Sequence, residues 1–296
     1  MIEYLFTRVF IELFRFIPFR LLYLISDFSS FFMHFVVMYR KRVVYDNLVK
    51  AFPEKTKSEI REVAKKSYKN FTDITLESIK MFTMSNEEVL KRFVAINPEF
   101  LDKYYNKNQS IIGVGGHYTN WEWCSSLANL LNHRSITIYK PLNNKRLTKY
   151  FNKNRSRFGM KLIALESTGR AFKDISTPTS ILLVADQSPS SLTHSIWVEF
   201  LGRDTPCIHG PEAYSKKFNL PVVYYDFQRI KRGYYTTEFS ELVNNPNEYE
   251  KGEITAIYMK KLEKVIRKKP EGWLWTHKRW KHKRKNGVIL KDYFYK

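Results

Sequence analysis

Two periodicities divide the chain. Residues 2–38 are dense in Phe, Leu, Ile and Val, and Pro18 interrupts them. Residues 56–82 repeat apolar side chains at the helical period of about 3.6, and Thr56 and Glu59 at their start have the spacing of a capping box. From residue 110 onward, short apolar runs alternate with amphipathic stretches. We therefore predict a helical N-terminal part followed by a region that mixes strands with helices.

The region after residue 110 is typical of a sheet covered by helices. Short apolar runs predict strands at 110–114, 136–139, 162–165, 179–185, 221–227 and 234–239. Amphipathic patterns predict helices at 121–131, 145–158 and 253–269. Strands that alternate with helices in this way favour parallel pairing. We expect one α/β domain over residues 41–296, with a mixed, largely parallel sheet flanked by helices.

The N-terminal segment has the composition of a membrane-associated element. Residues 19–38 have the length of a membrane span, about 20 residues, but they contain the polar residues Arg20, Asp27 and His34. The segment is therefore either one imperfect span or a pair of interfacial helices broken at Pro18. A helical hairpin packed on the domain is the alternative. Many Phe residues beside Arg suit an apolar–polar boundary, so we expect residues 1–40 to be a helical membrane anchor.

The amino-acid composition limits the kinds of partner that this chain is expected to bind. The chain has 296 residues, with 50 Lys and Arg against 29 Asp and Glu, which gives a formal net charge of +21. Such an excess predicts an anionic partner: nucleic acid, an acidic membrane surface or an acidic substrate. The chain has only two cysteines, Cys124 and Cys207, which excludes a disulfide scaffold.

The first candidate chemistry lies where the strand at 110–114 ends. Gly115 and Gly116 are followed by His117, and Glu122 comes five residues after the histidine. Across a turn into a helix this spacing allows the two side chains to meet. A histidine held by a carboxylate is a general base, because the carboxylate fixes its tautomer and stabilises the imidazolium. The alternative is a loop histidine and a glutamate that complements the helix dipole.

Three further positions are candidates. Arg155 lies on the apolar face of the helix at 145–158, where an arginine is costly unless it meets an anion; a side chain that snorkels to solvent is the alternative. Asp186 and Gln187 follow the strand at 179–185, at the carboxyl end where open α/β sheets bind ligands. A simple loop start is the alternative for these two.

The C-terminal part interleaves tryptophan with cations between residues 273 and 281. The pattern fits either a basic tail whose aromatic rings pack back on the domain, or an interfacial anchor or anion-binding wall.

Together these motifs resemble the lipid A late acyltransferases, a branch of the lysophospholipid acyltransferase superfamily. The resemblance extends over nearly the whole chain. Its motifs are 42–48, 51–53, the His-x4-acid motif from His117 to Glu122, 139–144, the Arg155 and Arg157 pair, Asp186-Gln187, 200–202 and 273–280. A bare His-x4-Glu is a weak signal, whereas this ordered set is specific. One departure is Cys207-Ile208-His209, where the family usually has small hydroxyl residues.

The resemblance implies a fold like that of the glycerolipid acyltransferases and a direct acyl transfer. His117 would deprotonate a hydroxyl of the acceptor, Glu122 would orient His117, and the alkoxide would attack a thioester of acyl carrier protein. Arg155 and Asp186 complete the implied catalytic set, Arg155 as a contact to a phosphate or oxyanion and Asp186 as an organiser of the site. The implied substrate-binding residues are Asn120, Trp121, Lys140, Arg157, Gln187, Arg203, Lys278 and Arg279.

The resemblance also implies the surroundings of the reaction. It implies no metal or nucleotide cofactor, an anionic lipid acceptor that is most simply a phosphorylated lipid A precursor, and a place on the cytoplasmic face of the bacterial inner membrane. Relatives with the same motifs acylate other lipids, including aminolipids, so the acceptor stays open.

Other classes of protein explain less of the sequence. A nucleic-acid-binding protein accounts for the charge but not for the Phe-rich N-terminus, and no RNA-binding signature is present, so we expect no nucleic-acid partner. A zinc site built from Cys124, Cys207, His117 and His209 lacks ligand spacing. A non-catalytic lipid-binding module is the more serious alternative.

Overall fold

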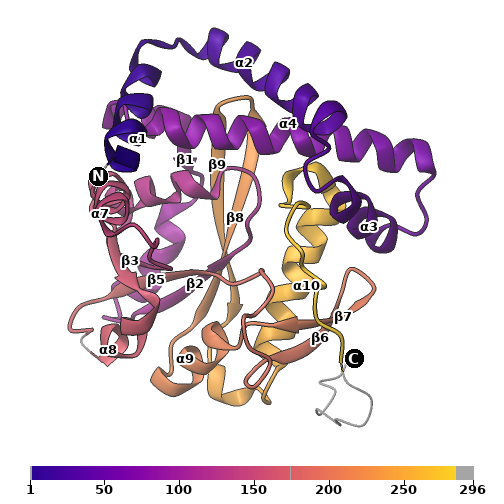
Figure 1. The fold of residues 1–296 in the computed structure, drawn as a ribbon. Helices are drawn as coiled ribbons and strands as arrows, with labels where there is room; N and C mark the ends of the chain where they lie inside the picture. Colours follow the sequence, from indigo (N-terminus) through magenta and orange to yellow (C-terminus); the bar gives the residue numbers. More distant parts are fainter. Residues whose placement is uncertain (1, 174, 285–296) are drawn as a thin grey trace.

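The computed structural model describes residues 2–173 and 175–284 (Figure 1). Within them a seven-stranded sheet has the order β1-β9-β8-β2-β5-β3-β4, and β6 pairs with β7 apart from it. Neighbours in the large sheet run parallel, except for β8 and β9. The strands are β1 (Phe93–Ala95), β2 (Ile111–Gly115), β3 (Arg134–Tyr139), β4 (Lys161–Ala164), β5 (Thr179–Val184), β6 (Ile196–Phe200), β7 (Arg203–Cys207), β8 (Val222–Lys231) and β9 (Tyr234–Val243).

Helices cover the sheet and one of its ends (Figure 1). They are α1 (Ile2–Leu13), α2 (Phe19–Phe31), α3 (Lys41–Ala51), α4 (Lys57–Met81), α5 (Asn86–Arg92), α6 (Asp102–Tyr105), α7 (Lys145–Ser156), α8 (Thr168–Lys173), α9 (Gly210–Phe218) and α10 (Glu253–Lys268). The predicted capping box forms, because the Thr56 hydroxyl accepts from the Glu59 amide and the Glu59 carboxylate accepts from the Thr56 amide.

The predicted α/β architecture with a mixed, largely parallel sheet is confirmed, and each of the six predicted strands is present within a few residues of its expected bounds. The segment expected to be helical at 121–131 is a 3₁₀ helix over Trp121–Asn129. The short edge strand β1 and the β6–β7 hairpin were not predicted.

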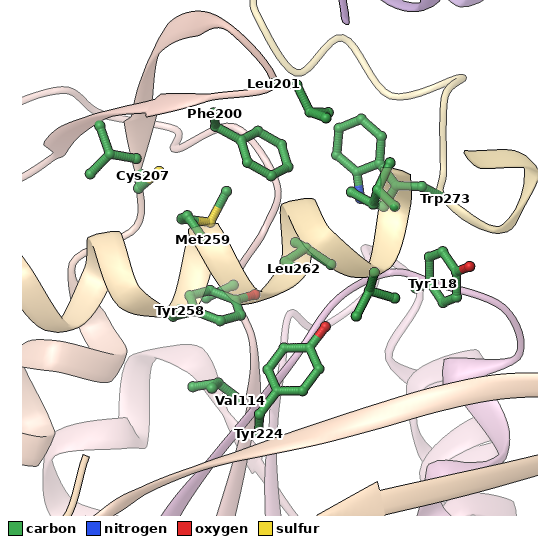
Figure 2. Close-up of a cluster of buried hydrophobic side chains, with 14 of the residues drawn as sticks. Val114, Tyr118, Phe200, Leu201, Cys207, Tyr224, Tyr258, Met259, Leu262 and Trp273 are labelled. Carbon is green, nitrogen blue, oxygen red and sulfur yellow. The ribbon is translucent and has the colours of Figure 1, made fainter. Parts of the chain in front are cut away.

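The core has two parts, one on each face of the sheet. Neighbouring residues of a strand point to opposite faces, and Ile112 and Tyr224 belong to one apolar cluster while Ile111 and Tyr225 belong to the other. Figure 2 shows part of the first cluster, where Leu262 and other side chains of α10 lie between the sheet and the β6–β7 hairpin. This packing fixes α10 and the C-terminal segment after it against the carboxyl end of β2.

The N-terminal segment forms separate helices. Pro18 is the N-cap of α2, so the chain breaks where the sequence predicts a break. Within the described residues, no single helix has the length and apolar composition of a membrane span. The bent pair Phe19–Val36 and Lys41–Ala51, whose parts meet at 88°, reaches that length and composition together. Helix α2 is fastened to α4, since the buried Ser26 hydroxyl donates to Asp73 Oδ1 at 2.6 Å.

A buried carboxyl joins these helices to the rest of the fold. Glu77, on α4, accepts hydrogen bonds from the Tyr235 hydroxyl at 2.6 Å and from Asn120 Nδ2 at 2.9 Å. The Tyr23 hydroxyl of α2 donates to its other oxygen at 3.1 Å. Burial raises the pKa of Glu77 to about 7, against the smaller effect of the Tyr235 hydrogen bond. One carboxyl therefore links α2, α4, β9 and the loop that follows β2.

This carboxyl predicts a component of stability that falls as the pH rises. An unfolded chain releases the Glu77 proton near its ordinary pKa of 4.5, while the folded chain keeps it to about 7. Between these values the folded state binds more protons, so stability declines by up to about 3 kcal/mol. Glu77→Gln, which keeps an acceptor for Asn120 and Tyr235, should flatten the decline in urea unfolding free energy between pH 5 and 7.5. The exposed Glu62→Gln on the same helix is the control. A decline in Glu77→Gln equal to that of wild type would contradict the role of this proton.

Candidate active site

The site is centred on His117 and Asp186. His117 lies just beyond the carboxyl end of β2, and Asp186 just beyond that of β5, the strand that pairs with β2 in parallel. Their side chains meet, with His117 Nδ1 at 2.5 Å from Asp186 Oδ1. The backbone N–H of His117 also donates to Asp186 Oδ2 at 3.0 Å. The carboxylate thus holds both the ring and the backbone of the histidine.

Asp186 is buried, with a side chain that is 1% exposed. A third donor reaches it from the C-terminal segment, since Trp273 Nε1 donates to Oδ2 at 2.8 Å. Burial by itself would raise the pKa of Asp186. The charge of His117 and the hydrogen bonds from His117 and Trp273 outweigh it, so the pKa lies below its ordinary value. Asp186 is therefore a carboxylate that accepts from Nδ1–H of the ring and leaves Nε2 free.

A glycine allows the loop after β2 to approach α10 closely. A Cβ on Gly116 would lie 2.6 Å from Cδ1 of Leu262 on α10. The absence of a side chain at residue 116 lets the loop after β2 pack directly on α10 and brings His117 to Asp186.

The expected contact between His117 and Glu122 is replaced by a different pairing. Glu122 Oε2 accepts from Arg155 Nη2 at 2.7 Å and from Arg155 Nε at 3.2 Å. Glu122 lies in the first turn of the 3₁₀ helix after Asn120, and the position beside Nδ1 of the ring is already filled by Asp186. The anion predicted for Arg155 on the apolar face of α7 is therefore Glu122.

His117 and the Glu122–Arg155 pair border one cavity of about 760 Å³, and Asp186 lies behind the histidine. His117, Glu122 and Arg155 line it together with Trp121 and Lys140 from the expected substrate-binding set. The rest of the wall is mainly apolar and comes from α1, α4, α7 and the strand ends, including Phe10, Ile74, Ile79, Phe151, Leu162 and Val184. A histidine held through Nδ1 by a carboxylate thus faces a cavity that suits an apolar chain.

The remaining expected substrate-binding residues do not line this cavity. Asn120 donates to Glu77, and the buried Arg279 donates to the Pro206 carbonyl at 2.8 Å. Arg157 donates to the carbonyls of Met81 and Met84, both at 2.8 Å, at the end of α4. Arg203 stacks over the Trp280 ring at 4.1 Å. Gln187 is half-buried and Lys278 is exposed.

Two residues near His117 and Asp186 were not predicted as site residues. Trp273 appeared only as part of an aromatic and basic alternation, although its indole N–H completes the contacts of Asp186. His277 accepts from the Ser188 amide through Nε2 at 3.0 Å, just after Asp186, and burial lowers its pKa to about 4. The only signal for either was their position in the C-terminal motif 273–280.

Among the residues that the structure describes, no group of three or more His, Cys, Asp or Glu side chains is placed to hold a metal ion.

An α/β sheet with a His–Asp pair at the carboxyl ends of adjacent parallel strands, beside an apolar cavity, can in chemical terms activate a hydroxyl next to an apolar chain. The comparison with protein families agrees with this class. Residues 2–282 match the model of the bacterial lipid A biosynthesis acyltransferases, and the chain belongs to that family. A search of curated proteins found no significant match. Family membership supports an acyltransferase that acts on lipid A-like substrates.

The geometry predicts the tautomer of His117. With Nδ1–H donated to Asp186, the neutral ring should carry no proton on Nε2 in long-range ¹H–¹⁵N spectra. Asp186→Asn should abolish this preference, because the amide can present a donor to Nδ1. Glu122→Gln is the matched control and should leave the tautomer unchanged. A change in Glu122→Gln with none in Asp186→Asn would restore Glu122 as the partner of the histidine.

Proposed function

We propose that the protein transfers a fatty acyl chain from an acyl carrier protein thioester to a hydroxyl of a phosphorylated lipid A precursor. The observation that carries the proposal is that His117, held by Asp186, lies on the wall of the apolar cavity. Membership of the lipid A acyltransferase family supports the substrate class.

The proposed reaction follows from the orientation of the histidine. Nε2 takes the proton of the acceptor hydroxyl as its oxygen attacks the thioester carbonyl, and Asp186 stabilises the imidazolium that forms. The tetrahedral intermediate then expels the thiolate of the carrier, which recovers the proton from His117. The ester and the free thiol are the products, and the enzyme is unchanged.

Arg155 lines the same cavity as His117, which supports a role in stabilising the charge that develops in this step. Its Nε and Nη2 are used by Glu122, which leaves Nη1 for a second acceptor at the cavity. We assign Glu122 the role of holding this guanidinium in place, and Arg155 that of donating to the oxyanion of the intermediate.

The proposal predicts that His117→Ala loses acyl transfer. Purified protein is incubated with the carrier thioester and a lipid A precursor, and the ester product is measured by mass spectrometry. Removal of a general base should lower turnover by about 10²–10⁴-fold. The exposed His194→Ala is the control and should be unaffected. Undiminished turnover in His117→Ala would leave a non-catalytic lipid-binding protein as the better account.

We further propose that the N-terminal helices attach the enzyme to the membrane, on its cytoplasmic face. Large apolar side chains of α1 and α2 are exposed, among them Phe6 at 72% and Phe28 at 69%. So much exposed apolar surface on one part of a protein marks an interaction site. Arg20 and the basic residues 40–42 lie in the same segment and suit anionic head groups.

Membrane attachment predicts a specific loss of binding. Phe6→Ser with Phe28→Ser should weaken co-flotation with vesicles of anionic phospholipid by more than about tenfold, because each ring contributes roughly 1.5–3 kcal/mol when buried. The control removes two exposed leucines elsewhere, Leu130→Ser with Leu165→Ser. Equal flotation of both variants and wild type would contradict attachment through these helices.

A further inference from the structure

Helix α1 separates three environments. Thr7, Phe10 and Ile11 line the catalytic cavity. Tyr4, Arg8 and Glu12, spaced at i, i+4 and i+8, line a second cavity of about 690 Å³. The remaining face, with Ile2, Leu5, Phe6, Val9 and Leu13, is exposed and apolar. One helix thus roofs two cavities and turns its third face outward.

Helix α7 forms the opposite wall of both cavities, close to α1 in Figure 1. Its Thr148, Phe151 and Arg155 line the catalytic cavity, while Arg146, Lys149 and Lys153 line the second one. The two are divided by Phe82, which lines both and whose ring packs on Tyr150 at 5.6 Å and on Phe151 at 5.2 Å. A group bound in the second cavity is therefore next to the reaction site.

The second cavity is strongly basic. Its charged lining consists of one carboxylate, Glu12, and the cations Arg8, Arg146, Lys149, Lys153 and Arg157. Glu12 is already paired with Arg15 at 2.9 Å, and Arg157 is held by backbone carbonyls. Among the described residues, none of the salt bridges involves Arg8, Arg146, Lys149 or Lys153. Four cations therefore converge on a hollow with little internal compensation, which favours binding of an anion.

We propose that this basic cavity binds a phosphate group on the head group of the lipid acceptor. The inference rests on the proposed function. A concave site walled by arginine and lysine suits a phosphate, because both side chains make charge-assisted hydrogen bonds to its oxygens. The outward apolar face of α1 places the cavity at the depth of lipid head groups, which favours the acceptor over the carrier-bound donor. A phosphate held here would hold the rest of the acceptor on the His117 side of Phe82.

The test neutralises two of these cations. Lys149→Gln with Lys153→Gln is compared with Lys145→Gln with Lys264→Gln, which makes the same change in charge with exposed lysines outside the cavity. Acyl transfer is measured with a phosphorylated lipid A precursor and with the same lipid after phosphatase treatment. Binding of each protein to detergent micelles that contain either lipid is measured separately.

We expect the KM for the phosphorylated acceptor to rise about tenfold in Lys149→Gln with Lys153→Gln, an effect of about 1.4 kcal/mol. The kcat, the KM for the donor and the KM for the dephosphorylated acceptor should stay within about twofold, and the control variant should match wild type. A rise in the donor KM instead, or equal loss with both acceptors, would overturn the proposal.

The two proposals fail in different ways. If wild-type protein transfers no acyl chain to either lipid, the proposed function fails. The micelle measurement still shows whether the basic cavity binds phosphate. Preferential binding of the phosphorylated lipid that is lost in Lys149→Gln with Lys153→Gln supports the phosphate site. Equal binding of both lipids by wild type overturns it.

Discussion

The site depends on the burial of one carboxylate. Asp186 accepts the ring and backbone N–H groups of His117 and the indole N–H of Trp273, so it joins the ends of β2 and β5 to the C-terminal segment. A buried carboxylate is costly unless its oxygens are fully bonded, and these three donors satisfy both of them. The same contacts set the orientation of His117. The hydrogen bonds that make the burial of Asp186 possible are therefore also those on which the proposed chemistry of His117 depends.

The second carboxylate of the site has a separate task. Glu122 faces the cavity and holds Arg155, while Asp186 lies behind the histidine. In the proposed reaction the His117–Asp186 pair transfers the proton, and Arg155, held by Glu122, stabilises the negative charge. The cavity wall beside these groups is mainly apolar, and the side chains of Glu122 and Arg155 are 32% and 33% exposed. Because α1 also carries an exposed apolar face, one short helix links the proposed membrane attachment to the shape of the cavity.

Much of this could be predicted from the sequence. Apolar runs that alternate with helices predict the parallel sheet, and the position of His117 and Asp186 after two such runs predicts that both lie at its carboxyl edge. That they touch could not be predicted, because β2 pairs with β5 across two intervening strands in the chain, and tertiary packing sets this order. Because strand order is invisible in the sequence, the five-residue spacing made Glu122, the carboxylate nearer in the chain, the expected partner of His117. Trp273 lies 87 residues from Asp186 and carries no local signal of their contact.

The most direct measurement is the single-turnover rate of acyl transfer in Asp186→Asn and Glu122→Gln, with substrate affinities measured alongside. If Asp186 orients the general base, Asp186→Asn lowers the rate by about 10²–10⁴-fold while both affinities stay near those of wild type. Glu122→Gln should cost less, because the amide that replaces the carboxylate would still present an oxygen to Arg155. A rate for Asp186→Asn within about twofold of wild type would contradict the central role of the His117–Asp186 pair.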